Sequence, residues 1–298
     1  MSDVIVPRIG IHTSTAGGID QAAVRALELG ANCFQVFSAS PRMWRAAPPQ
    51  ADAIARLMTL RRDHDLKPLV VHDNYLINLA SADPVIRRKS IAAYRGEIER
   101  ALAVGADYLV AHPGSYRGQS LEAGIEACAG GVREAAAGLK SRTLTLLIEN
   151  TAGSGAAIGS RFEELAEIRR LLQRAGVGFR VGFCIDTCHA WAAGYDIVSE
   201  KGLEAVVCEI ARILGLDHIP VIHANDSKGA FGSRLDRHAN IGEGTIGRQG
   251  FRRILRHPAL RDKAFILETP VDQEGDDRRN LRLLKRLASA PPRANKSL

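Results

Sequence analysis

The sequence predicts a single-domain (β/α)₈ barrel, the TIM-barrel architecture, on three observations. Eight short apolar runs alternate with eight longer helical patterns along the chain. The runs are rich in Val, Ile, Leu and Phe, as strands buried in a parallel sheet are. Eight such units on roughly 250 residues are the expectation for this barrel. A doubly wound open sheet is the alternative, and it is less favoured because no G-x-G-x-x-G turn follows the first run.

Each strand is predicted from an apolar run. In chain order, the predicted strands are 8–12, 33–37, 68–72, 107–112, 145–150, 181–186, 219–226 and 264–269. The helices are predicted from apolar residues at helical spacing and from boundary residues. The stretch 18–29 ends at Gly30, and 84–104 begins with Pro84 and ends at Gly105. The other predicted helices are 51–65, 121–139, 161–175, 200–214, 247–255 and 277–288.

The composition is that of a globular protein. Of the 298 residues, 46% are hydrophobic, which is enough to form a large core. No apolar run approaches the length of a membrane span. The first residues, MSDVIVPRIGIH, lack the basic region and long apolar run of a secretory signal. The five cysteines are odd in number and form no C-x-x-C pair, which favours reduced thiols and a cytoplasmic location.

The net charge of +7 is concentrated at the C-terminal end. From Arg278 onward there are seven Lys and Arg residues and no acidic one, whereas the preceding 277 residues balance at 33 of each sign. We expect the barrel to span residues 1–288 and residues 289–298 to form a basic, disordered tail. A basic tail can raise non-specific affinity for nucleic acid, but it does not establish such a function.

Six successive predicted strands end in residues of the kinds that bind metals. These residues are His72, His112, Glu149, Asp186, His223 and Glu268. The carboxyl ends of TIM-barrel strands meet at one face, where the active sites of these enzymes lie. Charged groups at the ends of buried strands are costly unless they are paired or coordinated. The pattern therefore predicts a metal site at this face, and separate salt bridges at the rim are the alternative.

Three further ligand candidates lie in loops. His189 follows the sixth strand, and Asp236 and His238 lie in a segment rich in Gly and Arg. The nine candidates exceed the three or four protein ligands that a single zinc ion takes. They suit two or three ions, some of them bridged by a carboxylate. Multi-metal sites of this kind are typical of phosphoester hydrolysis.

The motifs around these residues resemble those of the endonuclease IV family of zinc-dependent apurinic/apyrimidinic (AP) endonucleases, also called AP endonuclease family 2. The resemblance covers residues 9–287. The motifs are specific together, although each alone is weak. They are IGIHTSTAGG (9–18), HDNYLINL (72–79), AHPGS (111–115), LIENTAG (147–153), IDTCHAWAAGYD (185–196), HANDSK (223–228), GSRLDRHANIGEGTIG (232–247) and LETP (267–270).

This resemblance implies a DNA repair enzyme with three zinc ions per chain, which cleaves DNA on the 5′ side of abasic sites. The products implied are a 3′-hydroxyl and a 5′-deoxyribose phosphate. Glu149 is implied as the catalytic residue that orients or deprotonates the attacking water. The ligand sets implied are His72, His112 and Glu149 for the first ion; Glu149, Asp186, His223 and Glu268 for the second; and His189, Asp236 and His238 for the third.

The resemblance also implies three residues that enter double-stranded DNA at the abasic site. These are Arg42, Tyr75 and Leu76. An arginine plane, an aromatic ring and an aliphatic wedge can replace a flipped nucleotide in the base stack. Ordinary loop packing is the alternative for each of them. A monomer is expected, because one closed barrel needs no partner to bury its core.

Two other functions remain open from the sequence. A metal-dependent sugar isomerase or epimerase on a related barrel would need one or two ions and a proton-transfer pair, but no third metal group. A nucleic-acid-binding protein without catalysis would have no use for the full ligand set, and its buried carboxylates would be costly. His12 at the end of the first strand is expected to support the site without binding a metal.

Overall fold

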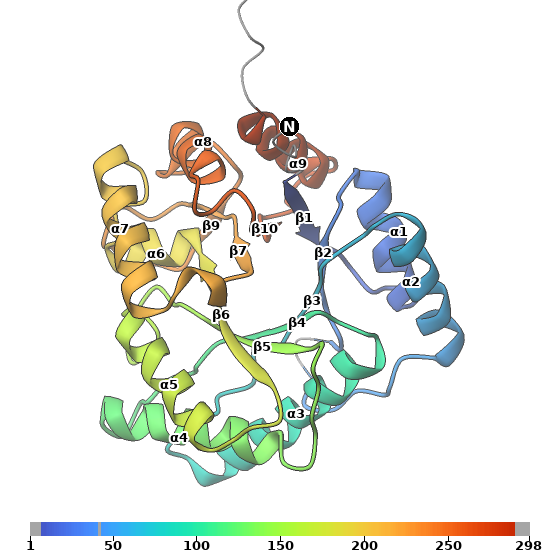
Figure 1. Cartoon of the computed structure of the whole chain (residues 1–298), viewed down its shortest axis with the longest axis vertical. Coiled ribbons are helices and arrows are strands. Elements are labelled where there is room, and N and C mark those ends of the chain that lie inside the picture. The colour runs from blue at the N-terminus through green and yellow to red at the C-terminus, as the bar shows by residue number, and fades with distance from the viewer. Residues whose placement is uncertain (1–6, 41–42, 290–298) are drawn as a thin grey trace, which may run out of the picture.

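The computed structural model describes residues 7–40 and 43–289, and within them it confirms the predicted closed barrel. Eight parallel strands follow one another around the barrel, and the last pairs with the first to close it (Figure 1). The barrel strands are β1 Arg8–His12, β2 Phe34–Phe37, β3 Leu69–His72, β4 Tyr108–Ala111, β5 Thr145–Glu149, β6 Arg180–Asp186, β7 Val221–His223 and β10 Ala264–Leu267.

Helices surround the barrel on its outside (Figure 1). Several begin at the boundary residues that the sequence offers. Asp83, for example, accepts hydrogen bonds from two backbone N–H groups of the first turn of α3, and Pro84 is the first residue of that helix. Within the described residues the α-helices are α1 Ile19–Leu29, α2 Ala51–Asp63, α3 Pro84–Ala103, α4 Leu121–Ala135, α5 Phe162–Arg174, α6 Thr187–Ala193, α7 Glu200–Ile213, α8 Gly247–Arg256 and α9 Asp276–Ala288.

The inside of the barrel is filled by a layer of small and branched side chains. This inner layer consists of Cys33, Val70, Val110, Leu147, Cys184, Val221, Ala264 and Ile266. Side chains alternate along a strand, so the residue two positions later points to the same side. Val70 is thus followed by His72, and Leu147 by Glu149. The inner layer therefore supports a second layer of polar side chains at the carboxyl ends of the strands.

The seventh unit departs from the prediction. The strand expected at 219–226 leaves the barrel after His223, and Asp226–Ser227 (β8) pairs antiparallel with His238–Ala239 (β9). We call this two-stranded element, with the segment 228–237 that joins its strands, the ribbon. Within the described residues α6 is also additional to the eight predicted helices. Both departures lie at the mouth of the barrel.

Asp226 explains why the chain turns away from the barrel here. Its fully buried carboxylate accepts hydrogen bonds from five backbone N–H groups, those of Ser227, Gly242, Gly244, Ile246 and Gly247, at 2.8–3.3 Å. The segment that follows the ribbon wraps around this side chain. A Cβ atom on Gly244 would lie 2.5 Å from Asp226 Oδ1, so only glycine allows this approach.

The two ends of the chain lie partly outside the described residues. The expected tail at 289–298 begins with Ser289, directly after α9, and its remaining residues are not described. Among the described helices, none is both long enough and apolar enough to cross a membrane.

Candidate metal centre

All nine predicted ligand residues meet at the mouth formed by the carboxyl ends of the strands. A cavity of about 390 Å³ opens there. Six of the predicted ligands line it, together with His12, Phe37 and Tyr75: they are His72, His112, His189, Asp236, His238 and Glu268. The other three, Glu149, Asp186 and His223, are fully buried beneath it.

Glu149 occupies the centre of this arrangement. Its Oε2 atom lies 3.1 Å from Nε2 of His72 and 3.4 Å from Nε2 of His112. Its Oε1 atom lies 2.9 Å from Nδ1 of His223 and 3.4 Å from Nδ1 of His189. One buried carboxylate thus faces four imidazoles, and its two oxygens point to different parts of the site.

The ligand atoms form groups compact enough to hold metal ions. In each group the atoms lie within 4.8 Å of one another. Three groups coincide with the ligand sets that the family resemblance implied: His72, His112 and Glu149; Glu149, Asp186, His223 and Glu268; and His189, Asp236 and His238. We call them the first, central and ribbon groups. The first and central groups share Glu149.

The ribbon group is assembled by the two unpredicted elements. Asp186 caps α6, because its Oδ1 atom accepts a hydrogen bond from the backbone N–H of His189 at 2.8 Å. This places the His189 ring toward the mouth, with Nε2 3.2 Å from Asp236 Oδ2. His238 Nε2 lies 3.5 Å from Asp236 Oδ1 and 3.7 Å from Asp186 Oδ2.

Hydrogen bonds on the far side of the rings identify the nitrogens that face the site. The Nδ1 atoms of His72, His189 and His238 lie 2.8–3.1 Å from the backbone carbonyls of Asp73, Asn150 and Glu268. A carbonyl only accepts, so each Nδ1 carries a proton, and each Nε2 is the nitrogen left to bind a metal ion at the centre. This is the arrangement of metal-ligating histidines.

The electrostatics favour positive charge at this mouth. Burial opposes ionisation of Asp236, but the hydrogen bond from His189 and the nearby imidazoles lower its pKa to about 2. Burial similarly opposes ionisation of Glu268, but the charge of His223 and other imidazoles lowers its pKa to about 2. For His72, burial is outweighed by Glu149, which raises its pKa to about 9. The carboxylates thus stabilise a cation here, whether imidazolium or metal.

One polar atom supports metal binding directly. His238 Nε2 is one of three buried side-chain atoms that find no hydrogen-bond partner among the described residues. It points at two carboxylates, and a lone pair left there would be costly. Together with the imidazole and carboxylate donor set, this atom fits a divalent ion in the ribbon group.

Several supporting residues were missed by sequence reasoning. Asn225 donates to Asp186 Oδ2 at 2.6 Å and to Glu268 Oε2 at 3.2 Å, and its own Oδ1 accepts from the Glu268 backbone N–H. Asn150 accepts from the Asp186 backbone N–H at 2.6 Å. Gln35 contacts His223 and Glu268 from β2. The sequence feature that could have identified them is a single Asn or Gln inside, or just after, an apolar strand.

Two buried cysteines lie close to the ligands. Cys188 Sγ shares a compact group with Asp186 and His238, but it also lies 3.7 Å from the Arg237 carbonyl, as a thiol donor does. Burial raises the pKa of Cys188 to about 12 and that of Cys184 also to about 12. Both therefore stay protonated thiols where no ion is bound, and because the three ligand groups are complete without them, we assign neither to a metal.

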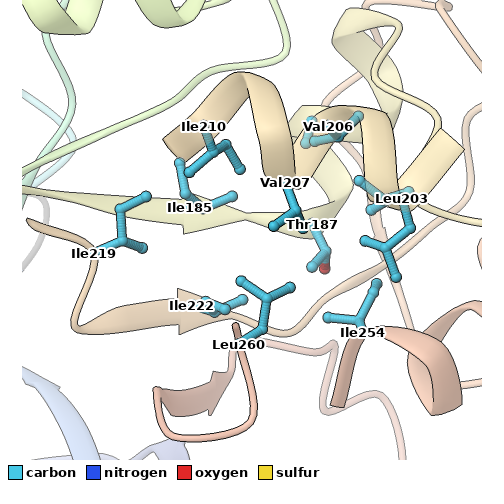
Figure 2. A pocket seen from close by; sticks show the side chains of 12 residues that line it. Ile185, Thr187, Leu203, Val206, Val207, Ile210, Ile219, Ile222, Ile254 and Leu260 are labelled. Carbon is cyan, nitrogen blue, oxygen red and sulfur yellow. The ribbon is translucent and has the colours of Figure 1, made fainter. Parts of the chain in front are cut away.

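A second cavity lies behind the site, between β6, β7 and α7. It measures about 30 Å³, and Figure 2 shows the aliphatic side chains that surround it. Ile185 and Ile222 line it, each directly preceding a ligand, while the Thr187 hydroxyl is bonded to the carbonyl of Asn225 at 2.8 Å. With no charged side chain in its lining, this cavity is a packing feature and not a site of chemistry.

The candidate DNA-contacting residues differ in what the structure shows. Arg42 lies outside the described residues. The Tyr75 side chain is 70% exposed at the mouth, and its ring packs edge-on against Phe37 with centroids 5.2 Å apart. Leu76 is half-buried, and its backbone N–H donates to Asn74 Oδ1 at 2.9 Å. The segment 74–76 is therefore held in shape, with an aromatic ring facing the cavity.

Comparisons with known proteins agree with this geometry. The family model described as xylose isomerase-like TIM barrel matches residues 23–287. A probable endonuclease 4 from Solibacter usitatus is 57% identical over 283 residues, which cover 95% of this chain and 97% of that protein. Another from Methanoculleus marisnigri is 42% identical over 282 residues, covering 95% and 99% of the two chains.

Solved structures give the same result. The crystal structure of endonuclease IV from Thermus thermophilus matches with a TM-score of 0.82 at 40% identity, covering 94% of this chain and 98% of that one. A D-tagatose 3-epimerase-like protein matches with a TM-score of 0.65 at 20% identity, which shows a shared fold alone. Since the identity to endonuclease 4 proteins extends over nearly the whole of both chains, this chain belongs to the endonuclease IV family.

Proposed function

We propose that this chain is a zinc-dependent AP endonuclease, which hydrolyses the phosphodiester bond 5′ to abasic sites in double-stranded DNA. The products would be a 3′-hydroxyl and a 5′-deoxyribose phosphate. The observation that carries the proposal is the presence of three compact ligand groups at one mouth, two of which share Glu149. Membership of the endonuclease IV family supports it.

The first, central and ribbon groups would hold one ion each. Imidazole and carboxylate donors suit zinc, which also supports the choice of metal. When bound, such ions lower the pKa of water and neutralise charge on the phosphate and the leaving oxygen. Six strand ends fix the positions of the first and central groups before any substrate arrives.

Glu149 is the proposed catalytic residue. It would orient the attacking water and take its proton at a carboxylate oxygen. The surrounding imidazoles, above all His223 and His112, outweigh burial and hold the pKa of Glu149 well below its usual range, so it is ionised and able to accept. Asp236 and His112 are the most exposed of the nine ligands, with 53% and 32% of their side chains accessible. The scissile phosphate would approach from their side.

The exposed ring of Tyr75, with Leu76 beside it, is proposed to enter the DNA at the abasic site, and Arg42 is proposed as a third such residue. Insertion between bases costs a few kcal/mol of stacking, which an already vacant abasic position reduces. Because less stacking energy is lost at an abasic site, these side chains would enter damaged DNA in preference to intact DNA. The fixed conformation of segment 74–76 supports this role, since little ordering would be needed on binding.

A duplex with a single tetrahydrofuran abasic analogue tests the proposal. Purified protein should incise the strand on the 5′ side of the analogue, and prior treatment with a chelator should abolish incision until zinc is returned. An intact duplex of the same sequence serves as the control. If zinc-loaded protein leaves the analogue strand whole, but epimerises a ketose, the sugar epimerase alternative is correct.

Three further properties belong to the same proposal. Three zinc ions per chain would be found by metal analysis, and two in a fully loaded sample would contradict the ribbon ion. A monomer is proposed because the barrel closes on itself, and light scattering would test it. A cytoplasmic location is supported by five cysteines that are all free thiols in the structure.

A further inference from the structure

The ring of His223 is held by a side chain, whereas three other histidine ligands are held by backbone carbonyls. The rings of His72, His189 and His238 rest on backbone carbonyls. The ring of His223 faces the site with Nδ1, and its Nε2 lies 2.8 Å from Oε1 of Gln35. A side chain from β2, a strand that supplies no ligand, therefore sets the orientation of a central ligand.

The orientation of the Gln35 amide follows from its neighbours. Its Nε2 atom lies 2.5 Å from Oε1 of Glu268 and 3.1 Å from Nδ1 of His12. A carboxylate can only accept, so the NH₂ group must face Glu268 and the carbonyl must face His223. The carbonyl in turn requires a proton on His223 Nε2. Nδ1 of His223, which lies 2.9 Å from Glu149 and 3.2 Å from Glu268, is thereby left as the nitrogen that would bind an ion of the central group.

His12 completes the arrangement from β1. Its Nδ1 accepts the second proton of the Gln35 amide, and its ring packs against Phe37 with centroids 4.4 Å apart. Because the NH₂ group of Gln35 is a donor, Nδ1 must be the accepting nitrogen of the His12 ring. Gln35 is itself fully buried, and both its carbonyl and its NH₂ group are used.

We propose that Gln35 is a positioning residue for the central group, which fixes His223 in the tautomer that presents Nδ1 and holds Glu268 Oε1 so that Oε2 faces the same point. The proposal rests on the metal centre of the proposed function, but not on its substrate. Partners of this kind typically change metal affinity about 10- to 100-fold when removed. The loss should be confined to the ion of the central group.

The test replaces Gln35 by methionine, which keeps the length of the side chain and removes its hydrogen bonds. Full-length protein, with nitrogen-labelled histidine, is loaded with NMR-active cadmium in place of zinc. In the wild type, the signal of the central ion should couple to His223 through Nδ1. In Gln35→Met this signal should shift or broaden, while the signal coupled to His189 and His238 stays unchanged.

Chelator competition measures the same effect as an affinity. One ion should leave Gln35→Met about 10- to 100-fold more readily than it leaves the wild type. Excess zinc should restore kcat on abasic DNA without a change in KM. Gln119→Met is the matched control, because it also removes an amide hydrogen bond, to the Ala80 carbonyl, away from the ligands. Wild-type cadmium spectra and affinities in Gln35→Met would overturn the proposal and leave the endonuclease function standing.

A second variant protects the test against misfolding of the first. His12→Phe keeps a ring against Phe37 but cannot accept the amide proton of Gln35. It should weaken the central ion less than Gln35→Met does, and the double variant should be no weaker than Gln35→Met alone, because His12 acts through Gln35. Additive losses, or an unchanged central ion in His12→Phe, would show that Gln35 does not depend on this partner and would contradict the arrangement.

Discussion

The strand-borne ligands and the ribbon-borne ligands are built in different ways. Four of the six strand-borne ligands, all but His112 and Glu268, are at most 3% exposed, and the strand-borne ligands stand on an inner layer of packed apolar residues. The side chains of Asp236 and His238, on the ribbon, are 53% and 20% exposed. The first and central groups are therefore positioned by the closed barrel, whereas the ribbon group depends on a small element added to the barrel.

The ribbon is small, and it is held by contacts with α6 as well as by one carboxylate of its own. Its two strands share only the pairs Asp226–Ala239 and Ser227–His238. A two-stranded ribbon of this size is not stable alone. Four of the five N–H groups around Asp226 belong to residues 242–247, so they tie the segment beyond the ribbon to the ribbon's first strand. Substitution of a strand-borne ligand should therefore abolish incision, whereas substitutions in the ribbon should only weaken it.

The largest effect is expected from Glu149→Gln. The variant removes the charge shared by the first and central groups, so incision of the tetrahydrofuran duplex should fall at least about a thousandfold, the scale on which loss of a preorganised electrostatic group acts. Binding of the abasic duplex, measured by fluorescence anisotropy, should survive. Glu126→Gln, at an exposed position on α4, is the control and should incise normally. Near-normal turnover in Glu149→Gln would remove this residue from its proposed role.

Asp236→Asn should cost less, on the order of a hundredfold in incision, because this change affects only the ribbon group. Metal analysis should give two ions per chain in place of three. The two that remain should resist chelator as they do in the wild type. If the variant loses all of its metal together, the two regions are not independent, and the comparison fails.

Asp226→Asn should disturb the ribbon without touching a ligand. An amide offers one acceptor oxygen and turns an NH₂ group toward backbone donors, which should destabilise this region by about 1–3 kcal/mol. Hydrogen exchange should rise in residues 238–247 and stay unchanged in the barrel strands. Equal protection in both proteins would show that packing, rather than this carboxylate, holds the ribbon.

The smallest effect is expected behind the strand-borne ligands. Val207 lines the cavity of about 30 Å³ in Figure 2. Val207→Ile adds one methylene group there and should stabilise the protein by about 0.5–1 kcal/mol, measured by urea unfolding. Val85→Ile, at a position that is 48% exposed, is the control and should change little. A loss of stability in Val207→Ile would mean that the cavity cannot accept the added group without strain.

The same division explains what could be predicted from the sequence. The six strand-end ligands were accessible because parallel strands present their carboxyl ends at one face, and His72 or Glu149 follows an apolar run. Asp236 and His238 were candidates from their residue types, but their grouping around a third ion came from family resemblance, since the ribbon that carries them has two-residue strands. Such strands leave no periodic pattern, and the contacts that hold them are distant in sequence; the carboxylate of Asp226, for example, bonds to backbone groups up to 21 residues away.

Gln35 was missed for a different reason. A polar residue in an apolar strand such as CFQVF has many possible explanations, and only the closed barrel shows that it lies in the same layer as the ligands. It follows Cys33 by two positions, as His72 follows Val70. Counting two residues beyond the inner layer on every strand would have found it. The residues that its amide contacts lie on β1, on β7 and just after β10, and the spacing of residues in the sequence does not identify them.

The pairing of β1 with β10 has a consequence for biosynthesis. Glu268 follows the last barrel strand, and β10 is also the strand that joins the two edges of the sheet. Until the ribosome has made this strand, the growing polypeptide lacks both a ligand of the central group and the strand that lies between β1 and β7. A nascent or prematurely terminated chain therefore carries no complete centre. A complete central group can therefore form only after translation has passed this strand.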